Sequence, residues 1–220
     1  MNYEIVLPIV FLMLMGLSIL MYAILDGYDL GVGILLPLET SAESQRDTMI
    51  ASIGPFWDAN ETWLVLAVGL LLIAFPEAHS LVLYQLYIPA VLMLCGLILR
   101  GVSFDFRAKA VVEHKQRWDS LFKLGSILTS LMQGYMLGQY VIGFDTAIPS
   151  ILFCIVSALC VTAAYSFIGA AWLIMKTTGS LQQRAFVWTR RTAWLCAFGI
   201  LLVSVVNPLV SDNVLSLIHI

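Results

Sequence analysis

The segment Trp57–Trp63 places two carboxyl groups and one amide at the start of an apolar run. These polar residues are Asp58, Asn60 and Glu61. The purely apolar remainder of the run, Trp63–Phe75, has 13 residues. At about 1.5 Å per residue it reaches about 20 Å, which is less than a hydrocarbon core of about 30 Å. The carboxyl groups are therefore expected to be drawn into the membrane, where ionisable side chains usually mark a proton pathway or a binding site.

Two simpler interpretations of this segment stay open. Asp58 and Glu61 could be first-turn acids in the headgroup zone, where the helix dipole favours them, because a tilted helix or a thinned bilayer also accommodates a short span. Trp57 and Trp63 could belong to the aromatic belt at the membrane interface.

Further ionisable residues lie at the ends of two other apolar runs. Asp26 and Asp29 end the first run and share a helical face, and Asp105 follows the third run. Three consecutive helices are thus expected to bring carboxyl groups to the same depth. Asp26 could instead cap the next helical segment. Arg100 could either extend to a lipid phosphate or pair with a buried carboxylate.

The composition is that of an integral membrane protein. Hydrophobic residues make up 60% of the chain and charged residues 11%, with a mean hydropathy of +0.93, whereas about a quarter of the residues of soluble domains are charged. No apolar run shows the alternation of a barrel strand, so the sequence predicts an all-α protein with six transmembrane helices. The predicted spans are Ile5–Leu25, Pro55–Phe75, Leu81–Leu99, Leu121–Ile142, Pro149–Met175 and Thr192–Val210.

The basic residues are distributed asymmetrically between these spans. All 11 Lys and Arg residues lie in or beside the connections that follow the first, third and fifth spans. By the positive-inside rule these connections face the cytoplasm and the N-terminus faces outward. No basic region precedes the first apolar run, so this run is expected to stay in the mature protein rather than to be removed as a signal peptide.

No extramembrane domain interrupts the predicted spans, so residues 1–220 are expected to form a single membrane domain. Nucleic acid is not an expected partner, because the chain has no basic tail or arginine-rich patch. A membrane haem is usually held by His or Met deep in a span, and none of the three histidines, His79, His114 and His219, is placed there. We therefore expect no metal or cofactor in this chain, and a proton-handling or scaffolding role beside another subunit.

Four segments, taken together, resemble subunit II of the cytochrome bd-type quinol oxidases. They are Leu25–Gly33, Ile53–Trp63 with Ala74–Pro76, Leu99–Arg107 and Gly169–Thr177. Their order and spacing over most of the chain make the resemblance specific. Phe56 and the ending Glu61–Trp63 resemble the cyanide-insensitive branch of that family.

The resemblance implies a complex of the bacterial cytoplasmic membrane that oxidises quinol and reduces dioxygen to water with protons from the cytoplasm. It places the haems and the quinol-oxidising loop in a partner, subunit I, and leaves open a small accessory subunit. Family members have eight transmembrane helices in two four-helix bundles. Residues 1–142 are thus expected to form the first bundle, and 143–220 part of the second. The chain is expected to be incomplete at its C-terminus, and whether residues 215–220 are native stays open.

The resemblance also suggests site residues. It makes Asp29, Asp58 and Asp105 candidates for proton access towards the haems of the partner, and it matches Trp63 to a position near the family's dioxygen route. Geometry alone adds further candidates at the same depth, which are Asp26 and Glu61, with Arg100 as their charge partner.

Two other functions stay open on the sequence. The alternative is a proton-coupled secondary transporter, because embedded acids and glycine-interrupted helices also occur there. It would require polar residues near the bilayer midplane, where such residues are few, with Gln133 and Thr129 as examples. A purely structural scaffold for the partner is the other possibility.

Overall fold

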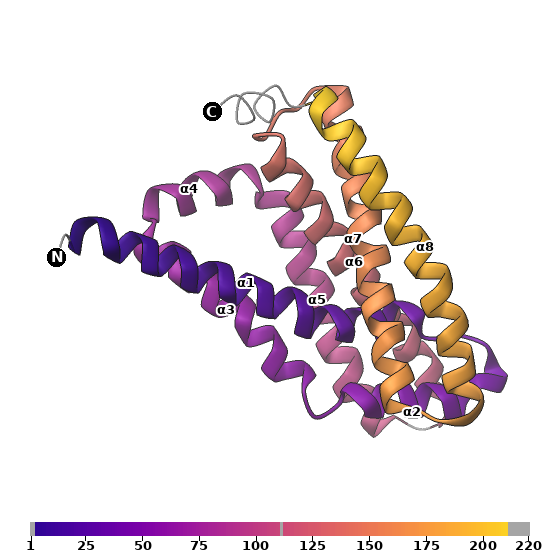
Figure 1. Cartoon of the computed structure of the whole chain (residues 1–220). Helices are drawn as coiled ribbons and strands as arrows, with labels where there is room; N and C mark the ends of the chain where they lie inside the picture. The colour runs from indigo at the N-terminus through magenta and orange to yellow at the C-terminus, as the bar shows by residue number, and fades with distance from the viewer. Residues whose placement is uncertain (1–2, 111, 211–220) are drawn as a thin grey trace.

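The computed structural model describes residues 3–110 and 112–210. Helices account for nearly all of these residues, and no strand occurs among them, which confirms the predicted all-α class. Helices are the expected secondary structure, because backbone N–H and C=O groups in lipid must form their hydrogen bonds within the segment. The elements are α1 (Tyr3–Leu35), η1 (Thr40–Ala42), α2 (Glu43–Ile53), α3 (Trp57–Ala74), α4 (Pro76–Gln85), α5 (Tyr87–Lys109), α6 (Val112–Val141), α7 (Ile148–Lys176) and α8 (Gly179–Val210) (Figure 1).

Five of the described helices are long and apolar enough to cross a membrane, namely α1, α3, α5, α7 and α8. The fourth predicted span, Leu121–Ile142, falls in α6, which is not among the five. Ser, Thr and Gln residues interrupt the apolar run of α6, and several of them are buried against other helices. The structure therefore supports five of the six predicted spans by length and hydropathy.

Two element boundaries differ from the prediction. Helix α1 continues without a break to Leu35, so Asp26 lies in its interior and does not cap a new segment. The predicted third span is divided at Leu86 into α4 and α5, and α4 takes a different direction from α5 in Figure 1. Pro89 explains this bend, because it has no N–H to bond to the carbonyl four residues earlier. His79, expected in a short turn, lies in α4.

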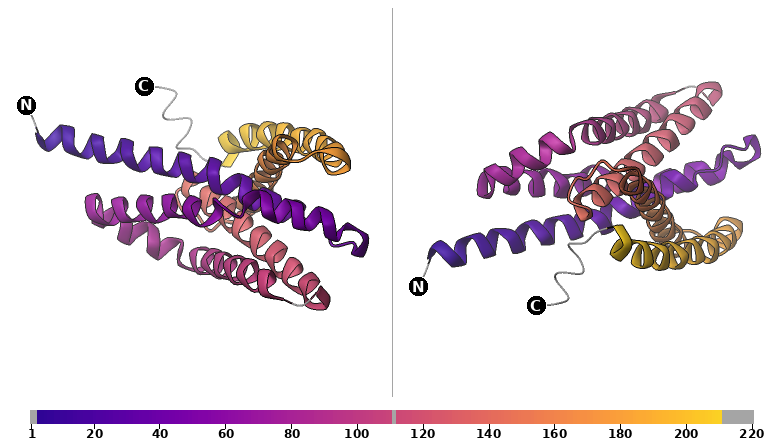
Figure 2. Two further views of the ribbon diagram at one scale, coloured as in Figure 1. Left: turned by 90° about the horizontal axis from the view of Figure 1, so that it is seen from below. Right: turned by 90° about the horizontal axis from the view of Figure 1, so that it is seen from above.

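Small residues let the long helices approach closely. A Cβ at Gly31 of α1 would collide with the carbonyl oxygen of Tyr165 in α7, and one at Gly138 of α6 would lie 2.8 Å from the Cα of Cys154. Helix α7 therefore packs against both α1 and α6. Figure 2 shows α8 on one side of α1 and the α3–α5 group on the other. The division into bundles 1–142 and 143–220 stays a prediction.

Candidate functional site

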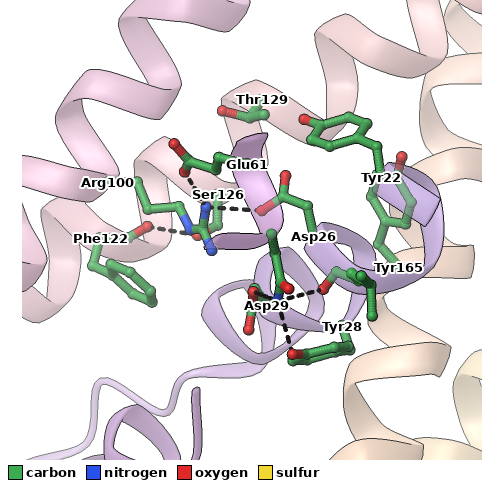
Figure 3. A network of polar contacts seen from close by, with 12 residues as sticks. Tyr22, Asp26, Tyr28, Asp29, Glu61, Arg100, Phe122, Ser126, Thr129 and Tyr165 are labelled. Atoms are coloured by element: carbon green, nitrogen blue, oxygen red, sulfur yellow. Dashed lines mark hydrogen bonds and ion pairs between the residues drawn. The ribbon is translucent and has the colours of Figure 1, made fainter. Parts of the chain in front are cut away.

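A buried arginine organises the polar centre of the molecule. Arg100 of α5 is fully buried, and its Nη1 donates to Asp26 Oδ1 of α1 at 3.1 Å and to Glu61 Oε1 of α3 at 2.7 Å (Figure 3). Three helices that are distant in sequence thus share one guanidinium. The guanidinium also lies 5.9 Å from the ring of Trp57 and 5.8 Å from the ring of Phe122, distances at which an aromatic face attracts a cation. Arg100 therefore pairs with carboxylates rather than extending to lipid.

A second carboxyl group is held beside this ion pair by an amide. Asn60 Nδ2 donates to Asp29 Oδ2 at 2.7 Å and to the hydroxyl oxygen of Tyr28 at 2.8 Å. Asp29 is fully buried, and Asn60 is nearly so. The Tyr28 ring stacks on Trp172 of α7 at 4.1 Å between centroids. Asn60 of α3 thus orients Asp29, while Trp172 of α7 packs against the neighbouring Tyr28.

The charges in this centre do not balance. Three carboxyl groups, those of Asp26, Asp29 and Glu61, face the single guanidinium of Arg100 (Figure 3). Full ionisation would leave two uncompensated negative charges in a low-dielectric interior, which is costly. A cluster of this kind can take up and release protons while the arginine keeps an ionised partner. We refer to these four residues as the Arg100 cluster.

The remaining candidates lie outside the Arg100 cluster. Asp58 of α3 and Asp105 of α5 are exposed, and neither forms an ion pair with a described residue. Trp63 is half-buried on α3. The structure therefore brings together Asp26, Glu61 and Arg100, which geometry selected, with Asp29. Of the other residues suggested by resemblance, Asp58 and Asp105 lie on the outer surface of this chain.

The structure contains a second buried ion-pair network, which the sequence analysis did not predict. Asp119 of α6 is fully buried and pairs with Arg46 of α2 at 2.8 Å and with Arg107 of α5, while Arg107 also pairs with Asp47 at 2.7 Å. We refer to these four residues as the Asp119 cluster. Sequence reasoning missed it because these residues lie in a stretch that reads as a solvated cytoplasmic connection. The short helix α2, which supplies two members, was not predicted.

No metal site appears in the part of the chain that the structure describes. No three His, Cys, Asp or Glu side chains within it are placed to hold an ion. His79 lies in α4 and His114 in α6, whereas His219 falls outside the described residues, as does the segment 215–220.

The fold and the site define a multi-pass α-helical membrane protein with an incompletely neutralised ion-pair cluster between its helices. A family profile described as cytochrome bd terminal oxidase subunit II matches residues 7–220. The chain belongs to this family, which confirms the resemblance found in the sequence.

Individual relatives agree with this assignment. The chain is 31% identical over 212 residues to the cytochrome bd-I ubiquinol oxidase subunit 2 of Escherichia coli strain K12, covering 89% of this chain and 54% of that protein. It is 33% identical over 174 residues to the cytochrome bd ubiquinol oxidase subunit 2 of Bacillus subtilis strain 168, covering 73% and 51%. It is 32% identical over 184 residues to the probable cytochrome oxidase subunit 2 of Haemophilus influenzae, covering 74% and 47%. The chain thus spans about half the length of these relatives.

Proposed function

We propose that this chain is the non-haem subunit of a membrane complex that oxidises quinol and reduces dioxygen to water. Its relatives are named as subunits of ubiquinol oxidases, and family membership covers residues 7–220. In this proposal a haem-bearing subunit I performs the redox chemistry, a small accessory subunit can join, and this chain contributes proton access and assembly. The related oxidase subunits do not favour the alternative of a proton-coupled secondary transporter.

The observation that carries the proton-access role is the Arg100 cluster. Arg100 Nη1 contacts two carboxyl groups at once, one from Asp26 and one from Glu61. A proton can therefore move from one carboxyl group to the other while the arginine keeps an ionised partner. Glu61 is the accessible member, since about a quarter of its side chain is exposed while Asp26 is fully buried.

The direction of proton delivery follows from the charge distribution. The basic residues of α2, the end of α5 and the start of α8 gather at one end of the molecule, where the Asp119 cluster also lies. We infer that this end is cytoplasmic and that the N-terminus faces outward. Asp58 and Asp105, exposed on α3 and α5, are then proposed to receive protons at the surface, and Trp63 to lie near the dioxygen route.

The haems supply oxygen reduction when bound in the partner, and the residues of this chain prepare protons for it. Arg100 holds the carboxyl groups of Asp26 and Glu61 in place. Asn60 orients Asp29 by direct hydrogen bonding. Trp57 and Phe122 flank the guanidinium and limit its contact with water.

The proposal is tested by tagging the protein at its chromosomal locus and purifying it in mild detergent. A haem-bearing membrane subunit and a reduced-minus-oxidised haem spectrum should co-purify with quinol oxidase activity. A colourless protein that transports a substrate in liposomes without a partner would refute the proposal. In the same complex, unchanged turnover of the Asp58→Asn variant with normal haem content would remove Asp58 from the proton path.

A further inference from the structure

A second polar chain connects three helices beside the Arg100 cluster. Gln133 of α6 donates from Nε2 to the hydroxyl oxygen of Tyr22 in α1 at 2.5 Å. Tyr165 of α7 donates from its hydroxyl to Gln133 Oε1 at 2.7 Å. Tyr22 and Tyr165 are both less than a tenth exposed. These three residues are not used by the proton-access role described above.

The hydrogen bonds of this chain have a defined direction. In the structure the Gln133 amide presents its oxygen to Tyr165, whose hydroxyl therefore donates in that contact. Its nitrogen therefore faces Tyr22, whose oxygen accepts. The Tyr22 hydroxyl proton is not engaged in either contact, so it remains available for one further acceptor.

The acceptor that lies nearest in the helix is Asp26. Tyr22 and Asp26 are four residues apart in α1 and share one face of the helix. Figure 3 shows Tyr22 beside the Asp26 carboxyl group. Asp26 Oδ1 accepts a hydrogen bond from Arg100, whereas its buried Oδ2 has no hydrogen-bond partner among the described residues. The geometry thus leaves one free donor facing one free acceptor.

We propose that Tyr165, Gln133 and Tyr22 form a directional hydrogen-bond chain that orients the Asp26 carboxyl group for proton exchange. The chain points Oδ2 of Asp26 at Tyr22, which keeps Oδ1 on Arg100 and therefore beside Glu61. Successive hydrogen bonds polarise one another, so each contact strengthens the next. The three members are positioning residues, and the inference rests on the proton-access role of Asp26.

The packing of α7 against α1 supports this assignment. A Cβ at Gly27 would lie 2.9 Å from Cδ1 of Tyr165, and a Cβ at Gly31 would collide with the Tyr165 carbonyl oxygen. The two glycines therefore admit Tyr165 to the helix interface at a close distance. Tyr165, the first residue of the hydrogen-bond chain, is thus held in place by the close packing of α7 on α1.

The chain offers a matched control on the same helix. Gln139 of α6 donates to the hydroxyl of Tyr135 at 3.4 Å. This glutamine–tyrosine pair lies within one helix, and its recorded contacts do not reach the Arg100 cluster. Gln139→Leu and Tyr135→Phe therefore report the cost of removing a similar glutamine–tyrosine pair from α6, at a place where Tyr135 also packs against α7.

The test measures quinol oxidase turnover, quinol KM and haem content of the purified complex. For Tyr22→Phe and Gln133→Leu we expect turnover to fall about three- to tenfold, as for the loss of one ordinary intramolecular hydrogen bond. KM and haem content should be unchanged, and the Gln139→Leu and Tyr135→Phe controls should turn over at the wild-type rate. In an Asp26→Asn background, Tyr22→Phe should cause no further loss, because coupled residues are not additive.

Three outcomes would overturn the inference. One is wild-type turnover of the Tyr22→Phe variant. This substitution keeps the ring and removes a single oxygen, so it preserves packing. It therefore tests the inference even if the Gln133→Leu variant fails to assemble. Another is a loss of turnover as large in the two controls as in the chain variants. The third is a Tyr22→Phe loss of the same factor with and without Asp26. If Asp26→Asn itself turns over normally, the proton-access role of Asp26 fails instead, and the two failures are thereby distinguished.

Discussion

The Arg100 cluster and the Asp119 cluster contain the same kinds of side chain in different proportions. The Arg100 cluster sets three carboxyl groups against one guanidinium, whereas the Asp119 cluster sets two against two. A network with equal numbers of acids and bases is most stable when all its members stay ionised, so it is suited to holding helices together. An acid-rich network can exchange protons without losing its cation. The ratio of acids to bases, rather than burial alone, separates the two roles.

The partners of the Asp119 cluster agree with a structural role. Arg46 also donates from Nη1 to the Glu39 carbonyl oxygen at 2.5 Å, just beyond the end of α1. Lys123 of α6 donates to the Leu36 carbonyl oxygen at 2.9 Å. These cations thus bind carbonyl oxygens of the segment that follows α1. The Asp119 cluster therefore joins α2, α5 and α6 and anchors the chain that leaves α1.

The largest expected effect comes from removing the cation of the Arg100 cluster. Arg100→Leu would leave buried carboxyl groups without a partner, which costs about 3–5 kcal/mol of unfolding free energy. We expect little assembled complex, measured as haem recovered per cell. Normal haem recovery for this variant would show that the cluster does not depend on its arginine.

A smaller loss is expected when the hub of the Asp119 cluster is neutralised. Asp119→Asn leaves Arg107 paired with Asp47, so the loss of unfolding free energy should be about 2–3 kcal/mol, below the full cost of breaking a buried pair. Thermal unfolding of the purified complex measures this loss. Turnover per haem should be unchanged in the complex that survives, and a lowered turnover per haem would contradict a purely structural role.

For Glu61, the accessible acid of the Arg100 cluster, we expect a loss of turnover without a loss of stability. Glu61→Gln keeps an oxygen that can accept from Arg100 but removes one exchangeable proton. Turnover should fall about tenfold, equivalent to about 1.4 kcal/mol in the barrier, while thermal stability and haem content stay near wild type. Equal losses of stability for Glu61→Gln and Asp119→Asn would remove the distinction between the two clusters.

The smallest effect is expected at an exposed acid outside both clusters. The pKa of Asp145, between α6 and α7, is lowered by hydrogen bonds from the Ser150 hydroxyl at 2.5 Å and from the Ala147 N–H. A lowered folded-state pKa contributes stability that is fully present above the ordinary Asp value of about 3.9 and is lost as the pH falls through the folded value. Ser150→Ala should thus lower the thermal midpoint slightly at neutral pH. The difference from wild type should shrink on acidification, and a difference that grows would contradict this assignment.

Much of the architecture could be predicted from hydropathy alone. The all-α class and five of the predicted spans follow from long apolar runs, because lipid permits few other backbone arrangements. The fourth predicted span, in α6, is not supported by hydropathy, since polar residues such as Ser126, Thr129 and Ser130 interrupt its apolar run; these residues are buried in the structure. Helix α2 was missed because its residues have the composition of a solvated connection.

The candidate site was predictable only in part. Asp26, Asp29 and Glu61 were found because acids near apolar runs are rare, and helical spacing put pairs of them on one face. The sequence could not separate them from Asp58 and Asp105, which are equally acidic but exposed in this chain. It also did not identify Asn60 as the residue that orients Asp29, or Tyr22 and Gln133 as neighbours of Asp26.

The sequence by itself determined that this protein lies in the membrane, that it belongs to a family of oxidase subunits, and that unusual acids gather near three helix ends. These properties depend on composition, motif order and local periodicity. Only the tertiary structure decided which acids share Arg100, and that Asp119 has two arginine partners. Pairing across helices depends on how closely backbones approach, and that distance is set by small residues such as Gly31 in contact with another helix.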